Sequence, residues 1–179
     1  RARPLPEPVL RLMRSLPPGN LMDAVRTVVS ALAHYDPDAD DNSQTAAIRK
    51  AVRVTAQTGT VVATLGRLAA GGAPIDPDPV LGHAANFLYL LTGDRPDALA
   101  ERAFDVALIL HADHELNAST FAGRVAAATL TDLHSTVVAG VATLKGPLHG
   151  GANAEVMKLL ESIGEDADDE RVPTTITGM

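Results

Sequence analysis

Apolar residues recur at helical spacing from the start of the chain. Residues 9–16 and 21–35 both follow this pattern, and the Pro17-Pro18-Gly19 run between them predicts a break. Asn20 is a suitable N-cap for the second segment. Its apolar stripe consists of Met22, Val25, Val28, Val29 and Leu32. The pattern predicts two amphipathic helices in the first 35 residues.

The apolar period continues through most of the remaining chain. Residues 43–70 predict two helices, or one helix broken near Thr58 and Gly59. The β-branched run at 61–64 resembles a strand, but the apolar residues after it continue a 3.6-residue period, so we favour a helix. The other predicted helices cover residues 80–91, from Pro96 through Leu110, 117–130, 133–144 and 153–163.

The composition agrees with an all-α fold. The chain has 179 residues, which is the size of one domain, and 46% of them are apolar. Aromatic residues make up only 3%, and tryptophan is absent, so Ala, Leu and Val must form the core. Closely packed helices suit these residues better than a sandwich or barrel does. The helices at 117–130 and 133–144 are rich in small residues, which predicts a central or subunit-interface position.

Charge and cysteine content exclude several classes of protein. The net charge is −7 and no Lys/Arg-rich run occurs, which argues against a nucleic-acid or anionic-membrane surface. Cysteine is absent, so disulfides and thiolate chemistry are excluded and a cytoplasmic protein is expected. No apolar run approaches the roughly 20 residues needed to span a bilayer. The chain begins with arginine and ends outside any predicted element, so we expect both ends to be cut.

Residues 111–120, HADHELNAST, form the first chemically rich cluster. If the preceding helix continues, His111, His114 and Glu115 share one face and match the ligand types of a zinc site. The order differs from the usual His-Glu-x-x-His pattern, and no paired cysteine accompanies it. The simpler interpretation is a helix end with solvated polar side chains.

Residues 145–153, KGPLHGGAN, form the second cluster and place His149 in a Gly/Pro turn before a predicted helix. A helix N-terminus presents free N–H groups and favours a neutral imidazole. A neutral imidazole N–H can stabilise an enolate that forms on a carbonyl. Taken alone, however, the turn favours an ordinary Gly-rich loop that carries a solvated histidine.

Together the two clusters resemble the citrate synthase family. The matching runs are residues 103–120 and 144–153, with further similarity to bacterial members at 84–89 and 22–27. The resemblance covers nearly the whole chain. It implies an all-helical, dimeric enzyme with a large and a small domain, which condenses acetyl-CoA with oxaloacetate to give citrate and CoA.

The resemblance also implies roles for individual residues. His149 matches the catalytic imidazole that holds the thioester carbonyl, and His114 matches the histidine that contacts oxaloacetate. Asn117 and Ser119 match residues beside the substrate, with Ser119 placed to orient His149. Arg3 is compared with an arginine that the family places near the substrate. The resemblance implies no metal or redox cofactor. The CoA thioester is a substrate rather than a cofactor.

The resemblance divides the chain into an incomplete large domain at 1–150 and the start of the small domain at 151–179. A second catalytic histidine, an aspartate base and late arginines belong to the family and are expected after Glu170, so we expect the chain alone to be inactive. Two local departures occur: Asn20-Leu21-Met22 replaces a common His-Pro-Met, and Thr58-Gly59-Thr60 replaces a common Pro-Thr pair. The alternatives are a 2-methylcitrate synthase that uses propionyl-CoA, and a non-catalytic helical binding module.

Overall fold

The computed structural model describes residues 2–112, 115–151, 155 and 158. Every regular element in this described part is a helix, which confirms the all-α prediction. The elements are α1 (Glu7–Ser15), α2 (Leu21–Leu32), the short 3-10 helix η1 (Ala33–Tyr35), α3 (Gln44–Ala69), α4 (His83–Thr92), α5 (Ala98–Ala112), α6 (Ala118–Ala128) and α7 (Leu133–Leu144). None of the described helices combines the length and the apolar character that a membrane span requires.

Helix α3 corrects the sequence analysis, because it runs for 26 residues without the break predicted near Thr58 and Gly59. Gly59 serves close packing instead: a Cβ there would lie 3.1 Å from the ring of His83 at the start of α4. Burial on this face outweighs the roughly 1 kcal/mol that a glycine costs in a helix. Helix α4 begins at His83 rather than at Val80, and Val80 is exposed. The helix predicted at 153–163 lies outside the described residues.

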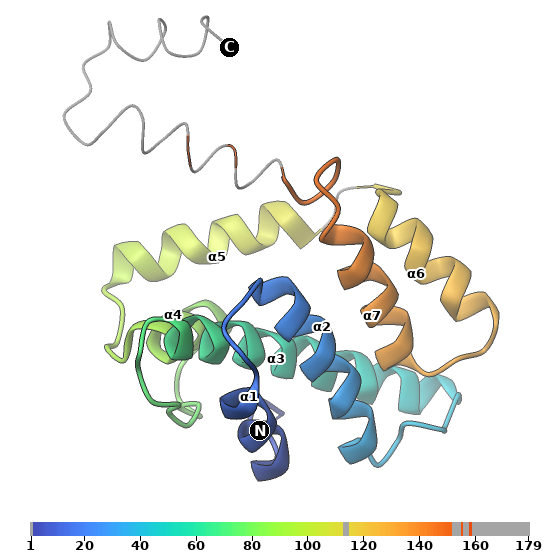
Figure 1. Cartoon of the computed structure of the whole chain (residues 1–179), viewed down its shortest axis with the longest axis horizontal. Helices are drawn as coiled ribbons and strands as arrows, with labels where there is room; N and C mark the ends of the chain where they lie inside the picture. Colours follow the sequence, from blue (N-terminus) through green and yellow to red (C-terminus); the bar gives the residue numbers. More distant parts are fainter. Residues whose placement is uncertain (1, 113–114, 152–154, 156–157, 159–179) are drawn as a thin grey trace, which may run out of the picture.

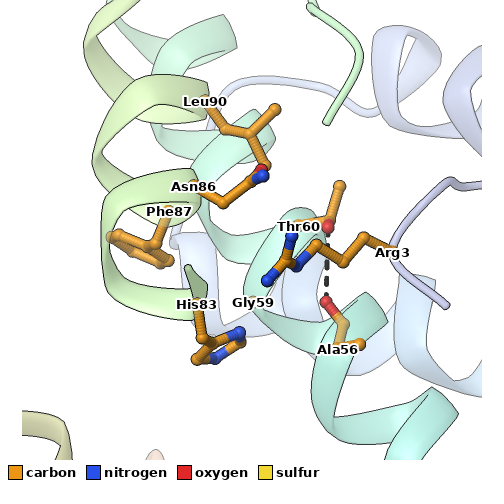
Figure 2. A pocket seen from close by; sticks show the side chains of 8 residues that line it. All are labelled: Arg3, Ala56, Gly59, Thr60, His83, Asn86, Phe87 and Leu90. Carbon is orange, nitrogen blue, oxygen red and sulfur yellow. Dashed lines mark hydrogen bonds between the residues drawn. The ribbon is translucent and has the colours of Figure 1, made fainter. Parts of the chain in front are cut away.

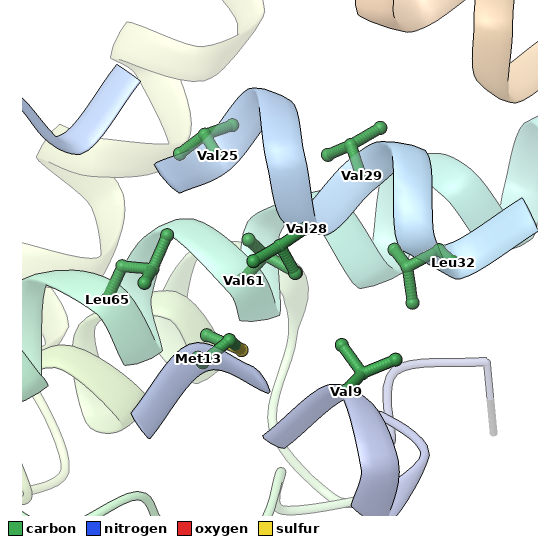
Figure 3. Packing of buried hydrophobic residues seen from close by; sticks show 8 residues of the cluster. All are labelled: Val9, Met13, Val25, Val28, Val29, Leu32, Val61 and Leu65. Carbon is green, nitrogen blue, oxygen red and sulfur yellow. The ribbon is translucent and has the colours of Figure 1, made fainter. Parts of the chain in front are cut away.

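The core forms where three helices meet, as Figure 3 shows. Its buried side chains are Val9 and Met13 from α1, Val25, Val28, Val29 and Leu32 from α2, and Val61 and Leu65 from α3. Val137, Val138 and Val141 of α7 pack against this cluster. Val25, Val28, Val29 and Leu32 of the predicted stripe therefore face the core, whereas Met22 is only partly buried and lies outside the cluster. Helix α7 is attached to the same core.

Helices α4 to α7 complete the fold around this core. In Figure 1, α2 lies along α3, and α6 and α7 stand side by side at one end of the molecule. Helices α6 and α7 approach closely because Gly123 faces Thr136 and Gly140 faces Ser119. Helix α5 is attached to α4, where the rings of Phe104 and Phe87 stack with centroids 4.7 Å apart. This arrangement brings the start of α6 close to the end of α7.

A buried polar cluster holds the start of α7 against α3 and the loop after η1. His134 is only 1% exposed, and its Nε2 lies 3.6 Å from Asp36 Oδ2. Its Nδ1 lies 3.8 Å from an oxygen of Asp132, the N-cap of α7. Arg53 of α3 pairs with Asp36, and the buried Lys50 donates to two carbonyls of the same loop, at Ala39 and Asp41. Sequence periodicity alone does not distinguish these buried polar residues from a solvated helix face.

Stability should fall on acidification because of His134. Burial lowers the pKa of His134 below its ordinary value of 6.5, so in mildly acid solution the unfolded chain binds a proton that the folded chain does not. By linkage, the free energy of unfolding should decrease as the pH falls from about 6.5 toward the folded-state pKa. Urea unfolding between pH 7.5 and 5 measures this slope. His134→Gln should flatten it, and an equal slope in both proteins would contradict the assignment.

Candidate active site

The predicted partners Ser119 and His149 are in direct contact. Ser119 Oγ lies 2.7 Å from His149 Nε2 and 3.0 Å from the carbonyl oxygen of Gly140. Ser119 sits in the first turn of α6, Gly140 is in α7, and His149 follows α7 after a short turn. All three groups are partly buried, so they are held by the α6–α7 packing rather than by loop contacts alone.

The Ser119 hydroxyl has a single proton, so it can donate either to the Gly140 carbonyl or to His149 Nε2, and this choice sets the tautomer of His149. When the hydroxyl donates to Gly140, the Nε2–H of His149 donates to Ser119 Oγ, and Nδ1 of a neutral ring is an acceptor. When the hydroxyl donates to Nε2, Nδ1 carries the ring proton and becomes a donor. The second arrangement gives up the hydroxyl's hydrogen bond to Gly140 and gives His149 an Nδ1–H on the side away from Ser119, where it can bind a carbonyl oxygen.

The backbone after α7 fixes where His149 lies. The N–H groups of His149 and Gly150 both donate to the carbonyl of Gly146, at 3.0 and 3.1 Å. The turn folds back onto the end of α7 so closely that a Cβ at Gly150 would overlap the carbonyl oxygen of Leu144. Gly150 is therefore required for close backbone approach, which explains why a glycine directly follows His149.

The first cluster is not the continuous helix that the zinc interpretation needs. Helix α5 ends at Ala112, and Glu115 adopts a φ of +52°, so Glu115 is not one turn beyond His111 on the same helix. His111 Nδ1 lies 2.7 Å from the carbonyl oxygen of Ala107 within α5. His114 lies outside the described residues. No group of three potential metal ligands occurs in the part of the chain that the structure describes.

Of the two other predicted site residues, Asn117 lies at the same helix end as Ser119, whereas Arg3 lies in another part of the structure. Asn117 is the N-cap of α6, where its side-chain oxygen accepts a hydrogen bond from the Thr120 N–H at 2.9 Å. It therefore stands two residues before Ser119, at the same helix end. Arg3 donates to the carbonyls of Leu81 and Asp78, at 2.9 and 3.4 Å, in the loop before α4. Its hydrogen-bond partners thus belong to the α3–α4 region and not to the Ser119–His149 pair.

Two hollows lie elsewhere in the described structure. Arg3 borders a cavity of about 10 Å³ between α3 and α4, and Figure 2 shows its side chain directed toward His83 and Asn86. A larger groove of about 640 Å³ runs between the α1–α2 connection and the end of α3. Neither hollow is lined by His149 or Ser119.

One contact near the site was not predicted. Lys145 Nζ lies 2.7 and 2.8 Å from the two carboxylate oxygens of Asp23 at the start of α2. These residues are 122 positions apart, so no local pattern connects them.

A helical core, an α6–α7 pair and a histidine bound by serine at this junction agree with the resemblance noted in the sequence. The family model described as "Citrate synthase, C-terminal domain" matches residues 1–178. The chain belongs to the citrate synthase family. The Ser119–His149 contact is thus part of a citrate synthase scaffold.

Individual members of the citrate synthase family support this placement. Citrate synthase 2 of Bacillus subtilis is 50% identical over 144 residues, which are 80% of this chain and 39% of the relative. The Citrate/2-methylcitrate synthase of the same organism is 42% identical over 175 residues, covering 97% of this chain and 47% of the relative.

A solved structure agrees as well. The ternary complex of Thermoplasma acidophilum citrate synthase with carboxymethyl coenzyme A and oxaloacetate superposes with a TM-score of 0.85 at 28% identity. The superposition covers 99% of this chain and 46% of the Thermoplasma chain. The chain therefore spans between about two fifths and half of the length of these relatives.

Proposed function

We propose that the natural protein containing this chain is a citrate synthase, which condenses acetyl-CoA with oxaloacetate to give citrate and CoA. The observation that carries the proposal is the 2.7 Å contact between Ser119 Oγ and His149 Nε2. It orients the imidazole and leaves Nδ1 for a substrate. The curated relatives at 42–50% identity carry the names citrate synthase and citrate/2-methylcitrate synthase, which supports the same class of reaction.

In the proposed reaction, His149 Nδ1–H donates a hydrogen bond to the thioester carbonyl oxygen. A carboxylate base removes a proton from the adjacent methyl group, and the electron pair forms the enol carbon–carbon double bond. The charge that develops on oxygen is stabilised by the preorganised N–H of His149. The enol carbon attacks the ketone of oxaloacetate, and water then hydrolyses the citryl thioester and releases CoA. This sequence needs no metal or redox cofactor.

We propose that oxaloacetate binds beside the start of α6. His114 and Asn117 are the proposed contacts, since they precede Ser119 by five and two positions in the same cluster. Asn117 uses its amide oxygen to cap α6, which holds its side chain at this helix end. Arg3 is proposed as a further substrate-binding residue on the resemblance alone. We place the boundary between the large and small domains after residue 150, so that domain closure would exclude water from the condensation.

A second candidate reaction uses propionyl-CoA and yields 2-methylcitrate. It is favoured by the Bacillus subtilis relative named Citrate/2-methylcitrate synthase, which covers 97% of this chain. The chemistry of His149 is the same for both thioesters. The difference is one methylene group, whose discrimination is worth about 1–3 kcal/mol in a fitted pocket.

The test is release of CoA by the natural protein, measured with each thioester at saturating oxaloacetate. We expect oxaloacetate-dependent release with acetyl-CoA, and the ratio of kcat/KM between the two thioesters assigns the substrate. A higher kcat/KM for propionyl-CoA would replace citrate synthase by the second candidate. If neither thioester released CoA, both candidates would be rejected.

We also propose that the protein acts as a homodimer in the cytoplasm, with α6 and α7 in the subunit interface. Phe121 and Val125 lie one turn apart on α6 and are 61% and 55% exposed, so they form an adjacent apolar pair at the surface. A second copy of the chain would cover them. Sedimentation at micromolar concentration should give twice the protomer mass.

A further inference from the structure

We propose that Asp23 and Lys145 act as a positioning pair that holds the end of α7 in the place His149 requires. This inference rests on the proposed function of His149 as the imidazole that binds the thioester carbonyl. Neither residue is assigned a role in the reaction itself. They act through the backbone between Lys145 and His149.

The geometry of the pair is specific. Lys145 is the C-cap of α7, and its ammonium contacts both oxygens of Asp23, at 2.7 and 2.8 Å. Asp23 lies in the first turn of α2, where a negative charge stabilises the positive end of the helix dipole. Lys145 lies at the C-terminal end of α7, where a positive charge stabilises the negative end. The hydrogen bond from Lys145 also lowers the pKa of Asp23 below its ordinary value of 3.8.

The Asp23–Lys145 pair lies at the C-terminal end of α7, directly before the turn that carries His149. Val141 is the last α7 residue that packs on the core, and the backbone N–H of Lys145 donates to its carbonyl. The N–H of Gly146 then donates to Thr143, and His149 donates to Gly146, so the turn is built directly on the last turn of the helix. Among the described side-chain contacts, Asp23–Lys145 and Ser119–His149 therefore hold the segment from opposite ends. Loss of the first should let the helix end fray and broaden the position of His149.

Kinetics of the natural protein test the pair. Lys145→Met and Asp23→Asn should each lower kcat about three- to fivefold, the size expected for an exposed ion pair, while the KM for oxaloacetate stays unchanged. The double variant should be no worse than either single variant, because both remove the same contact. Lys145→Arg, which keeps the charge, should restore most of the lost rate.

Arg26→Met is the matched control. Arg26 contacts the same carboxylate, at 2.9 Å from Asp23 Oδ1, but it belongs to α2 and does not reach α7. It should therefore leave kcat unchanged. An equal loss in Arg26→Met, or normal kcat in Lys145→Met and Asp23→Asn, would overturn the positioning role while the proposed function stands.

Nuclear magnetic resonance of labelled histidine separates this inference from the proposed function. The ring signals of His149, assigned with His149→Gln, should shift or broaden in Lys145→Met and Asp23→Asn but not in Arg26→Met. This readout needs no turnover. Should the unmodified protein release no CoA, the proposed function fails, and unchanged His149 signals in the pair variants would independently overturn the positioning role.

Discussion

His149→Ala should lower the turnover of the natural protein by about 10²- to 10³-fold, the usual effect of removing one preorganised donor from an oxyanion site. Alanine cannot supply the N–H that the thioester carbonyl requires when enol charge develops. Because His149 is only partly buried and contacts Ser119 at the surface of the α6–α7 pair, the fold should survive the change. The measurement is steady-state CoA release at saturating oxaloacetate and thioester.

His34→Ala is the control for this experiment, since His34 lies in η1 and is not part of the candidate site. It should keep the turnover of the unmodified protein. Normal turnover in His149→Ala would show that another group holds the thioester, and the assignment of the catalytic imidazole would be wrong.

Gly150→Ala should lower turnover by about 10²-fold, although it removes no functional group. The added Cβ would overlap the carbonyl oxygen of Leu144, which is backbone and cannot rotate away, so the turn that carries His149 must move. A displacement of about 1 Å at a reacting group is enough for a loss of this size. Circular dichroism should show that the helices remain.

Gly151→Ala provides a neighbouring comparison. A Cβ at Gly151 would lie 4.0 Å from Pro147 Cβ, an ordinary contact distance, so this variant should stay close to normal activity. If the two variants were equally active, the close approach at Gly150 would not control the position of His149.

Local patterns predicted most of the helical architecture. The N-cap at Asn20, the core stripe of α2 and the limits of α7 follow from spacing and capping residues, and the structure confirms them. The predicted break in α3 was wrong because Gly59 accommodates the ring of His83, a contact that only the tertiary structure creates. Periodicity also failed to reveal the burial of Lys50 and His134, since a polar residue buried in the core has the same sequence signature as a solvated one.

The candidate site depended on a different kind of information. Ser119 and His149 are 30 positions apart, and it was the resemblance to a family that brought them together before the structure did. The resemblance left the Gly140 carbonyl and the Asp23–Lys145 pair unmentioned. Both are products of helix packing, and the second joins segments 122 positions apart. Long-range contacts of this kind need coordinates, because neither propensity nor local spacing constrains them.

In the proposed site, His149 holds the thioester carbonyl while Ser119 orients the ring. A crystal structure of the natural protein with oxaloacetate and a non-hydrolysable acyl-CoA analogue tests it most directly. The analogue's carbonyl-equivalent oxygen should lie about 2.7–3.2 Å from His149 Nδ1, with Ser119 Oγ still on Nε2. An analogue bound with that oxygen away from His149, or a ring that has released Ser119 to face solvent, would contradict the account.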